Sequence, residues 1–340
     1  MSENINLENL TSEKIENKIE ADIAFASTKI QEVKTELKKK IVGQENLIDC
    51  LLIGLFANGH ILVEGVPGLA KTLTVDSLSK ALDLGFNRVQ FTPDLLPSDL
   101  IGTEIYNSKT SNFEIKKGPI FNNFILADEI NRAPSKVQSA LLEAMAEKHI
   151  TIGNHTFDLD RPFLVLATQN PIEQTGTYKL PEAQLDRFML KVNVDYPSYE
   201  DEKSMYKKNI DGKEETINKV LSKKDISKIQ DTIKEIFVSD SIFEYTMNIV
   251  DATRNPDNYK LSEIKKYISY GVSPRAGLAI ISASKVVALM ANRSYVIPED
   301  VKKIASDVLS HRLVLTYEAM ADEINSSEII KKIVDNINVV

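Results

Sequence analysis

The feature that most constrains this chain is a glycine-bearing loop between a short apolar run and a helical pattern. The apolar run covers residues 61–64, and the loop ends in Lys71-Thr72. This layout is typical of a phosphate-binding P-loop, whose glycines allow a tight turn and expose backbone N–H groups to an anion. The lysine reaches the β- and γ-phosphates, and the hydroxyl after it ligates Mg²⁺. We therefore expect a nucleoside triphosphate site built from Gly65, Val66, Pro67, Gly68, Leu69, Ala70, Lys71 and Thr72.

One position of this loop departs from the general pattern, because Ala70 stands where glycine is usual. Alanine suits a helical backbone, so the loop keeps its geometry if position 70 already belongs to the helix. The helix that follows points its positive end at the phosphates. Its expected apolar face is Leu73, Leu78, Ala81 and Leu82.

Composition limits the class of protein. A length of 340 residues suggests two domains, and a hydrophobic share of 43% is enough for packed cores. The net charge of −8 argues against non-specific binding to nucleic acid or anionic lipid as the main activity. The single cysteine, Cys50, lies in an apolar stretch and is expected to be buried. The chain has no secretory pattern and no membrane-length apolar run, so we expect a cytoplasmic protein without membrane insertion.

The pattern of elements predicts an α/β fold. Residues 1–10 are polar and expected to be frayed, and a helical pattern follows from Ser12 to Lys40. Short apolar runs then alternate with helical patterns, which indicates a parallel sheet covered on both faces. After Pro197 the pattern is helical only. We expect an N-terminal helical segment (1–40), an α/β core (41–196) and an all-helical domain (197–340). The expected strands are 61–64, 88–91, 124–127, 163–168 and 188–194.

Two carboxylates follow the third expected strand. Residues 124–127 are apolar and lead directly into Asp128-Glu129, which fits a Walker B motif. Asp128 would hold Mg²⁺ through a water, and Glu129 would polarise the attacking water. Acidic residues at a strand end also serve as helix caps, but the P-loop upstream favours the catalytic interpretation.

Three further polar residues are candidates for the same chemistry. Asn170 follows the next strand, where its amide could position the lytic water or simply form a turn before Pro171. Arg187 precedes the fifth strand and could be an arginine finger for a neighbouring subunit or a salt-bridge partner of Asp186 or another carboxylate. Arg275 lies in the first turn of a helix, where a cation opposes the helix dipole. A phosphate contact would explain that position, and an exposed side chain is the alternative.

Other segments look structural. Residues 150–157 alternate around Gly-Asn and predict a β-hairpin, and residues 105–115 predict a second one. The four histidines are scattered without metal-ligand spacing.

Taken together, these motifs resemble those of the MoxR family of AAA+ ATPases. The similarity spans most of residues 41–280, and the alanine at position 70 is itself usual in that family. Besides the P-loop and Walker B stretches, it is carried by Ile41-Val-Gly-Gln44, Gln90-Phe-Thr-Pro-Asp-Leu-Leu-Pro-Ser-Asp99, Gly118-Pro-Ile-Phe121, Asn131-Arg-Ala-Pro134, Ala167-Thr-Gln-Asn-Pro171, Leu180-Pro-Glu-Ala-Gln-Leu-Asp-Arg-Phe188 and Ser273-Pro-Arg-Ala276.

The resemblance implies a five-stranded αβα core with a helical lid and ATP bound at their junction. It implies a ring, commonly a hexamer, in which Arg187 completes the next subunit's site. Asn170 would be sensor 1, Arg275 would be sensor 2, and Val42-Gly43 would lie near the adenine. The two hairpins would be the helix-2 insert and the pre-sensor-1 hairpin, which often touch substrates. Arg132 is a weaker candidate for an inter-subunit arginine.

The same resemblance implies chaperone-like remodelling of partner complexes, often together with von Willebrand factor A-domain proteins. A metal-chelatase motor subunit shares the helix-2-insert architecture and is an alternative. A nucleic-acid machine is a second alternative, which the net charge of −8 disfavours. A P-loop GTPase would need an Asn-Lys-x-Asp motif, and the sequence contains none.

Overall fold

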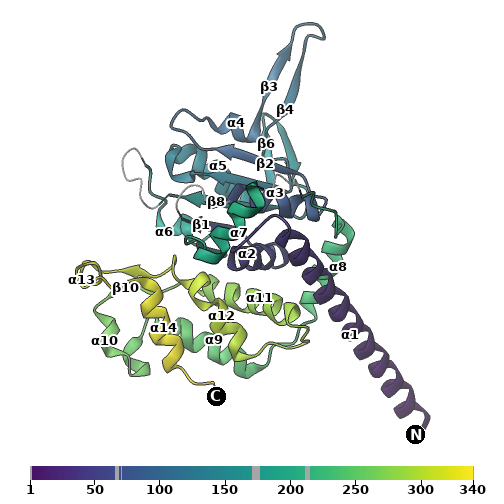
Figure 1. Ribbon diagram of the computed structural model, residues 1–340, viewed down its shortest axis with the longest axis vertical. Helices are drawn as coiled ribbons and strands as arrows, with labels where there is room; N and C mark the ends of the chain where they lie inside the picture. The colour runs from purple at the N-terminus through teal and green to yellow at the C-terminus, as the bar shows by residue number, and fades with distance from the viewer. Residues whose placement is uncertain (1, 66–68, 70, 171–176, 211–214, 340) are drawn as a thin grey trace.

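The protein is built around one parallel β-sheet with helices on both sides (Figure 1). The computed structural model describes residues 2–65, 69, 71–170, 177–210 and 215–339. The sheet has five strands in the order β2-β5-β8-β1-β9, so β8 lies between the P-loop strand β1 and the Walker B strand β5. This arrangement confirms the predicted α/β class. The strands are β1 (Ile61–Glu64), β2 (Phe86–Gln90), β5 (Phe124–Asp128), β8 (Leu164–Gln169) and β9 (Leu190–Asn193).

Apolar side chains leave both faces of the sheet, as a doubly covered parallel sheet requires. Val63 and Leu126 belong to a core shared with α2 (Glu45–Phe56) and α3 (Lys71–Ala81). Leu62 and Ala127, their neighbours along the strands, belong to a second core on the opposite face. That core contains α4 (Pro97–Ile101) and α5 (Ser135–Glu147).

Two antiparallel hairpins rise from the core, as the sequence predicted. They are β3 (Gly102–Asn107) with β4 (Asn112–Lys117), and β6 (His149–Ile152) with β7 (His155–Asp158). The β3–β4 hairpin extends well beyond the body of the protein (Figure 1). The rings of Tyr106 and Phe113 face each other across it at 5.4 Å, and both are largely exposed.

The N-terminal helix is longer than expected. Helix α1 covers Ser2–Lys38, so the prediction of a frayed start over residues 1–10 is wrong for the described residues 2–10. A helix satisfies its backbone hydrogen bonds locally and can continue without a packing partner. Further along, Ile30, Val33 and Leu37 are fully buried. Here α1 packs against α3, α8 (Lys223–Lys234) and α11 (Pro274–Met290). The N-terminal end of α1 projects away from the other elements (Figure 1).

The C-terminal part is helical except for one small sheet. Strands β10 (Ile268–Tyr270) and β11 (Val314–Leu315) pair in antiparallel fashion, which corrects the expectation of an all-helical region. Strands this short do not show an alternating pattern that sequence could reveal. The helices are α8 (Lys223–Lys234), α9 (Asp240–Ala252), α10 (Ser262–Lys265), α11 (Pro274–Met290), α12 (Pro298–Leu309), α13 (Tyr317–Ala321) and α14 (Ser326–Asn336), with the 3₁₀ turn η2 (Pro256–Tyr259).

Three short elements join these parts: η1 (Ile130–Arg132) after β5, α6 (Glu182–Leu185) before β9, and α7 (Tyr199–Ile210) after β9. Cys50 is buried in α2 with a free thiol, as expected. Within the described ranges, no helix combines the length and the apolar character that crossing a bilayer requires.

Candidate active site

The loop after β1 begins at a glycine that the packing requires. A Cβ atom at Gly65 would lie 2.6 Å from the carbonyl oxygen of Val194, too close for any side chain. The ammonium of Lys71 donates a hydrogen bond to the Gly65 carbonyl at 2.7 Å, so the first residue of α3 reaches back to the end of β1. Leu69 is buried. The predicted ligands Val66, Pro67, Gly68 and Ala70 lie outside the described residues.

A cleft of 380 Å³ opens at the carboxyl ends of β1, β5 and β8. The structure therefore brings together seven of the predicted site residues, from the P-loop segment, the Asp128-Glu129 pair and Asn170. Leu73 also lies here and is 41% exposed, so its assignment to the buried face of α3 is wrong. The described lining residues are Gly65, Leu69, Lys71, Thr72, Leu73, Arg88, Gln90, Asp128, Glu129, Thr168, Gln169 and Asn170.

Asp128 is the most strongly bound carboxylate of this cleft. Arg88 donates two hydrogen bonds to its Oδ2 atom, from Nη2 at 2.6 Å and from Nε at 3.1 Å. The Thr168 hydroxyl donates to the other carboxylate oxygen at 2.6 Å. Both oxygens are thus held by groups from the flanking strands β2 and β8.

Glu129 has an unusual backbone conformation. Its φ of 57° and ψ of 50° are left-handed, a region that non-glycine residues rarely adopt and that often marks a functional site. Its backbone N–H donates to the Thr168 hydroxyl at 2.9 Å. The Gln90 amide donates to carboxylate oxygen Oε2 at 2.8 Å, and the Arg132 Nε lies 3.1 Å from the same oxygen. Arg132, a weak candidate for an inter-subunit role, therefore pairs with Glu129 of its own chain.

The chemistry of the cleft suits an anion and a divalent cation. Burial lowers the pKa of the Lys71 ammonium, and the carboxylates of Asp128 and Glu129 act in the opposite direction. A half-buried lysine at a helix N-terminus gains from a phosphate that supplies negative charge. The Thr72 hydroxyl and the Asp128 carboxylate are the hard oxygen donors that Mg²⁺ prefers. These residues fit a magnesium–nucleotide complex.

Arg187 and Arg275 are not among the described residues that line this cleft. Arg187 lies in a separate depression beside α5, whose other lining residues include Glu143 and Glu147. Its Nη1 atom donates to the carbonyl of Leu142 at 2.7 Å.

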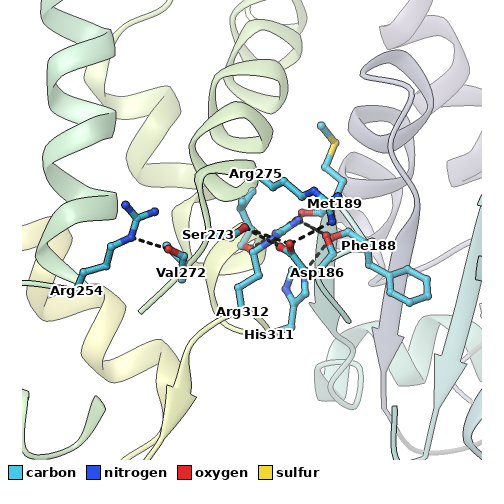
Figure 2. A network of polar contacts seen from close by, with 10 residues as sticks. Asp186, Phe188, Met189, Arg254, Val272, Ser273, Arg275, His311 and Arg312 are labelled. Atoms are coloured by element: carbon cyan, nitrogen blue, oxygen red, sulfur yellow. Dashed lines mark hydrogen bonds and ion pairs between the residues drawn. The ribbon is translucent and has the colours of Figure 1, made fainter. Parts of the chain in front are cut away.

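Arg275 lies on the C-terminal part of the chain, at the start of α11. Its Nη1 atom is 3.6 Å from the Asp186 carboxylate, and its side chain is 69% exposed (Figure 2). Asp186 immediately precedes Arg187, so the two arginines belong to one neighbourhood. Asp186 pairs with Arg275 and Arg312, and no ion pair joins it to Arg187 among the described residues.

Val42 and Gly43, the predicted adenine neighbours, also lie outside the described lining of the cleft. Gly43 has a φ of 73°, which favours glycine, and a Cβ atom there would lie 2.9 Å from the side chain of Asp201 in α7. The two residues thus lie next to α7 and are not among the described residues lining the cleft.

Sequence reasoning missed several residues of the site. Arg88 was recognised only as part of a strand. Gln90 and Thr168 were recognised only within strands and family-specific stretches, with no role assigned to either. The alternation of side chains along a strand could have identified two of them, since Arg88 and Gln90 are two positions apart in β2 and point to the same side of the sheet. The pairing of Gln90 with Asp128 in the sheet then places that side at the cleft.

Known proteins share both parts of this architecture. The ATPase family associated with various cellular activities (AAA) matches residues 60–190, and the AAA lid domain matches residues 261–333. The chain is 48% identical to chaperone MoxR1 of Mycobacterium tuberculosis over 302 residues, which is 89% of this chain and 80% of the relative. It is 28% identical to protein MoxR of Paracoccus denitrificans over 316 residues, covering 88% and 92% of the two chains.

A solved structure matches over nearly the whole length. It is the crystal structure of a Cytophaga hutchinsonii protein described as an ATPase, with a TM-score of 0.91 and 50% sequence identity. The match covers 95% of this chain and 98% of that one.

Proposed function

Because this chain belongs to the MoxR family of AAA+ ATPases, we propose that it hydrolyses ATP with Mg²⁺ and uses the energy to remodel partner protein complexes. The observation that carries the proposal is the cleft at the end of the sheet. It gathers a lysine, a hydroxyl, two adjacent carboxylates and an amide around one space. In this proposal residues 41–196 form the ATPase core and residues 197–340 form the lid.

The roles follow from charge and position. Lys71 binds the β- and γ-phosphates as a fixed cation, with Gly65, Val66, Pro67, Gly68, Leu69 and Ala70 as the loop around them. Thr72 and Asp128 hold Mg²⁺, which when bound neutralises charge on the phosphate oxygens. Arg88 donates two hydrogen bonds to the Asp128 carboxylate. Its guanidinium must therefore share or release that carboxylate when the cation binds. The family resemblance assigns Val42 and Gly43 to the adenine, although neither is among the described residues that line the cleft.

Glu129 acts as the base that orients and polarises water. The αL conformation turns its side chain at the end of β5, and the Thr168 hydroxyl fixes its backbone N–H. The Asn170 amide, between β1 and β5 in the sheet order, is suited to hold the same water or the terminal phosphate.

Arg187 completes the site of a neighbouring subunit in a head-to-tail ring, commonly a hexamer, and Arg275 acts as sensor 2 from the lid. Arg187 lies outside the cleft of its own chain, in a separate depression beside α5, which supports a role in trans. A heterologous interface presents a different surface on each side, so one subunit supplies Lys71 and the next supplies Arg187.

The exposed hairpins support action on protein partners. Tyr106 and Phe113 project at the tip region of the β3–β4 hairpin, where large apolar side chains are unusual unless they meet a partner. MoxR1, a relative, is described as a chaperone. We propose von Willebrand factor A-domain proteins as partners of the ring.

Replacing Glu129 by glutamine tests the hydrolytic proposal. The Glu129→Gln variant should bind ATP as the wild-type chain does and lose hydrolysis by about 10²–10⁴-fold, because an amide cannot accept the proton. Glu32→Gln, which changes an exposed acid on α1, is the control. An ATPase rate within a factor of two of wild type in Glu129→Gln would refute the assignment.

A further inference from the structure

Asp186, the residue before Arg187, is bound from the C-terminal part of the chain. Arg312 Nε donates to its Oδ1 atom at 2.8 Å, and the Ser273 hydroxyl lies 3.1 Å from Oδ2 (Figure 2). Arg275 is the third group at this carboxylate. The partners are separated by between 87 and 126 positions in sequence, so these contacts join the lid to the core.

Arg312 also holds the backbone on the other side of Arg187. Its Nη2 atom donates to the Phe188 carbonyl at 2.6 Å, and its Nη1 atom donates to the Met189 carbonyl at 3.1 Å. His311 donates from Nε2 to the same Phe188 carbonyl at 2.9 Å, since a carbonyl can only accept. One guanidinium therefore binds the residues before and after Arg187.

Residues 186–189 are also bound from the side of the ATPase core. The Phe188 ring is fully buried in the second core, and the Arg187 guanidinium donates to Leu142 in α5. Arg187 thus lies between a rigid helix and a lid arginine whose side chain is 3% exposed. A displacement of residues 311–312 cannot occur without moving residues 186–189 or breaking several bonds.

The buried ion pair of Arg312 with Asp186 is not well explained by a contribution to stability alone. A buried ion pair is often no more stabilising than apolar residues of the same volume, because desolvation offsets the attraction. Burial lowers the pKa of Arg312, which reflects this cost. The planar fork of arginine, by contrast, fixes several acceptors in one geometry.

We propose that Arg312 is a positioning residue that couples the lid to Arg187, so that the lid's position sets the position of the inter-subunit arginine. The inference rests on the trans role of Arg187 proposed above. The contacts predict that Arg312 affects catalysis at the neighbouring subunit's site and leaves ATP binding in its own cleft intact.

The first test separates this role from a general structural one. Arg312→Lys keeps the charge but loses the fork, and its kcat should fall on the order of 10²-fold, as expected for a misplaced catalytic group. Its ATP affinity, measured with a slowly hydrolysed analogue, should stay within twofold. The matched control is Arg293→Lys, which alters a buried pair with Asp300 that lies wholly within the lid. Equal losses of kcat in the two variants would overturn the proposal.

Coupling to Arg187 is tested in a double variant. In an Arg187→Lys background, adding Arg312→Lys should cost far less activity than in the wild-type chain, because both changes act through the same group. The same cost in both backgrounds would overturn the proposal, whether or not Arg187 acts in trans.

A mixing experiment assigns Arg312 to one side of the interface. Arg312→Met mixed with Lys71→Ala should recover ATPase activity, and Arg312→Met mixed with Arg187→Ala should not. If Arg312→Met does not fold, Arg312→Lys replaces it. Failure of the reference pair, Lys71→Ala with Arg187→Ala, would refute the proposed trans role. Recovery of that pair alone would refute the positioning role of Arg312.

Discussion

The side-chain amide of Gln90 donates a hydrogen bond to the carboxylate of Glu129 at 2.8 Å, across the ends of the neighbouring strands β2 and β5. Arg132 pairs with the same oxygen at 3.1 Å. Two donors of the protein thus hold the carboxylate that we assign as the base. A carboxylate held by two hydrogen-bond donors is less free to turn toward a water molecule.

Gln90→Ala should therefore raise the basal ATPase rate. Loss of one such hydrogen bond, about 0.5–1.5 kcal/mol, corresponds to an increase of about two- to tenfold. Steady-state hydrolysis at saturating ATP measures it, with Gln31→Ala on the exposed side of α1 as the control. A lower rate would mean that Gln90 holds Glu129 in its productive position.

Lys71→Ala should weaken ATP binding by at least about tenfold, because it removes the cation that meets the phosphates. Lys80→Ala is the matched control, since Lys80 lies on the same helix, is exposed and pairs with Asp76. Calorimetric titration with ATP measures both. Unchanged affinity in Lys71→Ala would exclude it from the phosphate site.

A pH-dependent contribution to stability is expected where α12 meets α2. Burial raises the pKa of Asp307 to about 6, while the Cys50 thiol, 3.7 Å away, and Lys303 act in the opposite direction. The folded protein holds this proton more tightly than the unfolded chain. The charged form therefore destabilises the fold above about pH 6, and this penalty disappears as the pH falls from 6 toward 4.

Asp307→Asn should remove that penalty. At pH 8 the variant should exceed wild type by about 3 kcal/mol in the free energy of unfolding, at 1.4 kcal/mol for each pKa unit. The difference should vanish near pH 4, where Asp307 is neutral in the folded state. Denaturant unfolding at both values measures it, with Asp231→Asn, an exposed acid, as the control. A difference independent of pH would contradict the account.

The sheet and the main residues lining the cleft were predictable because local patterns carry them. One apolar strand leads through a glycine-bearing loop to Lys71-Thr72 and another runs directly into Asp128-Glu129, so both place charged groups at one edge of a parallel sheet. The order of the strands was not predicted, because it depends on which strands pair in the folded chain.

The remaining contacts depend on tertiary pairing that no local pattern encodes. Gln90 reaches Glu129 only because the register sets Gln90 opposite Asp128. Arg312 lies 126 positions after Asp186, and its neighbours read as an ordinary helix end. The small β10–β11 sheet is likewise too short for a periodic signal.

The central claim is that each ATP site is shared between two subunits. Lys71→Ala and Arg187→Ala should each be inactive, and mixing them should restore hydrolysis. In a head-to-tail ring assembled at random from equal amounts, about one interface in four has both intact halves. The decisive measurement is the ATPase rate against mixing ratio, at a concentration where mixed rings are verified. A maximum near equal amounts, at about a quarter of the wild-type rate, is the predicted result. No recovery, or strong activity of Arg187→Ala by itself, would contradict the account.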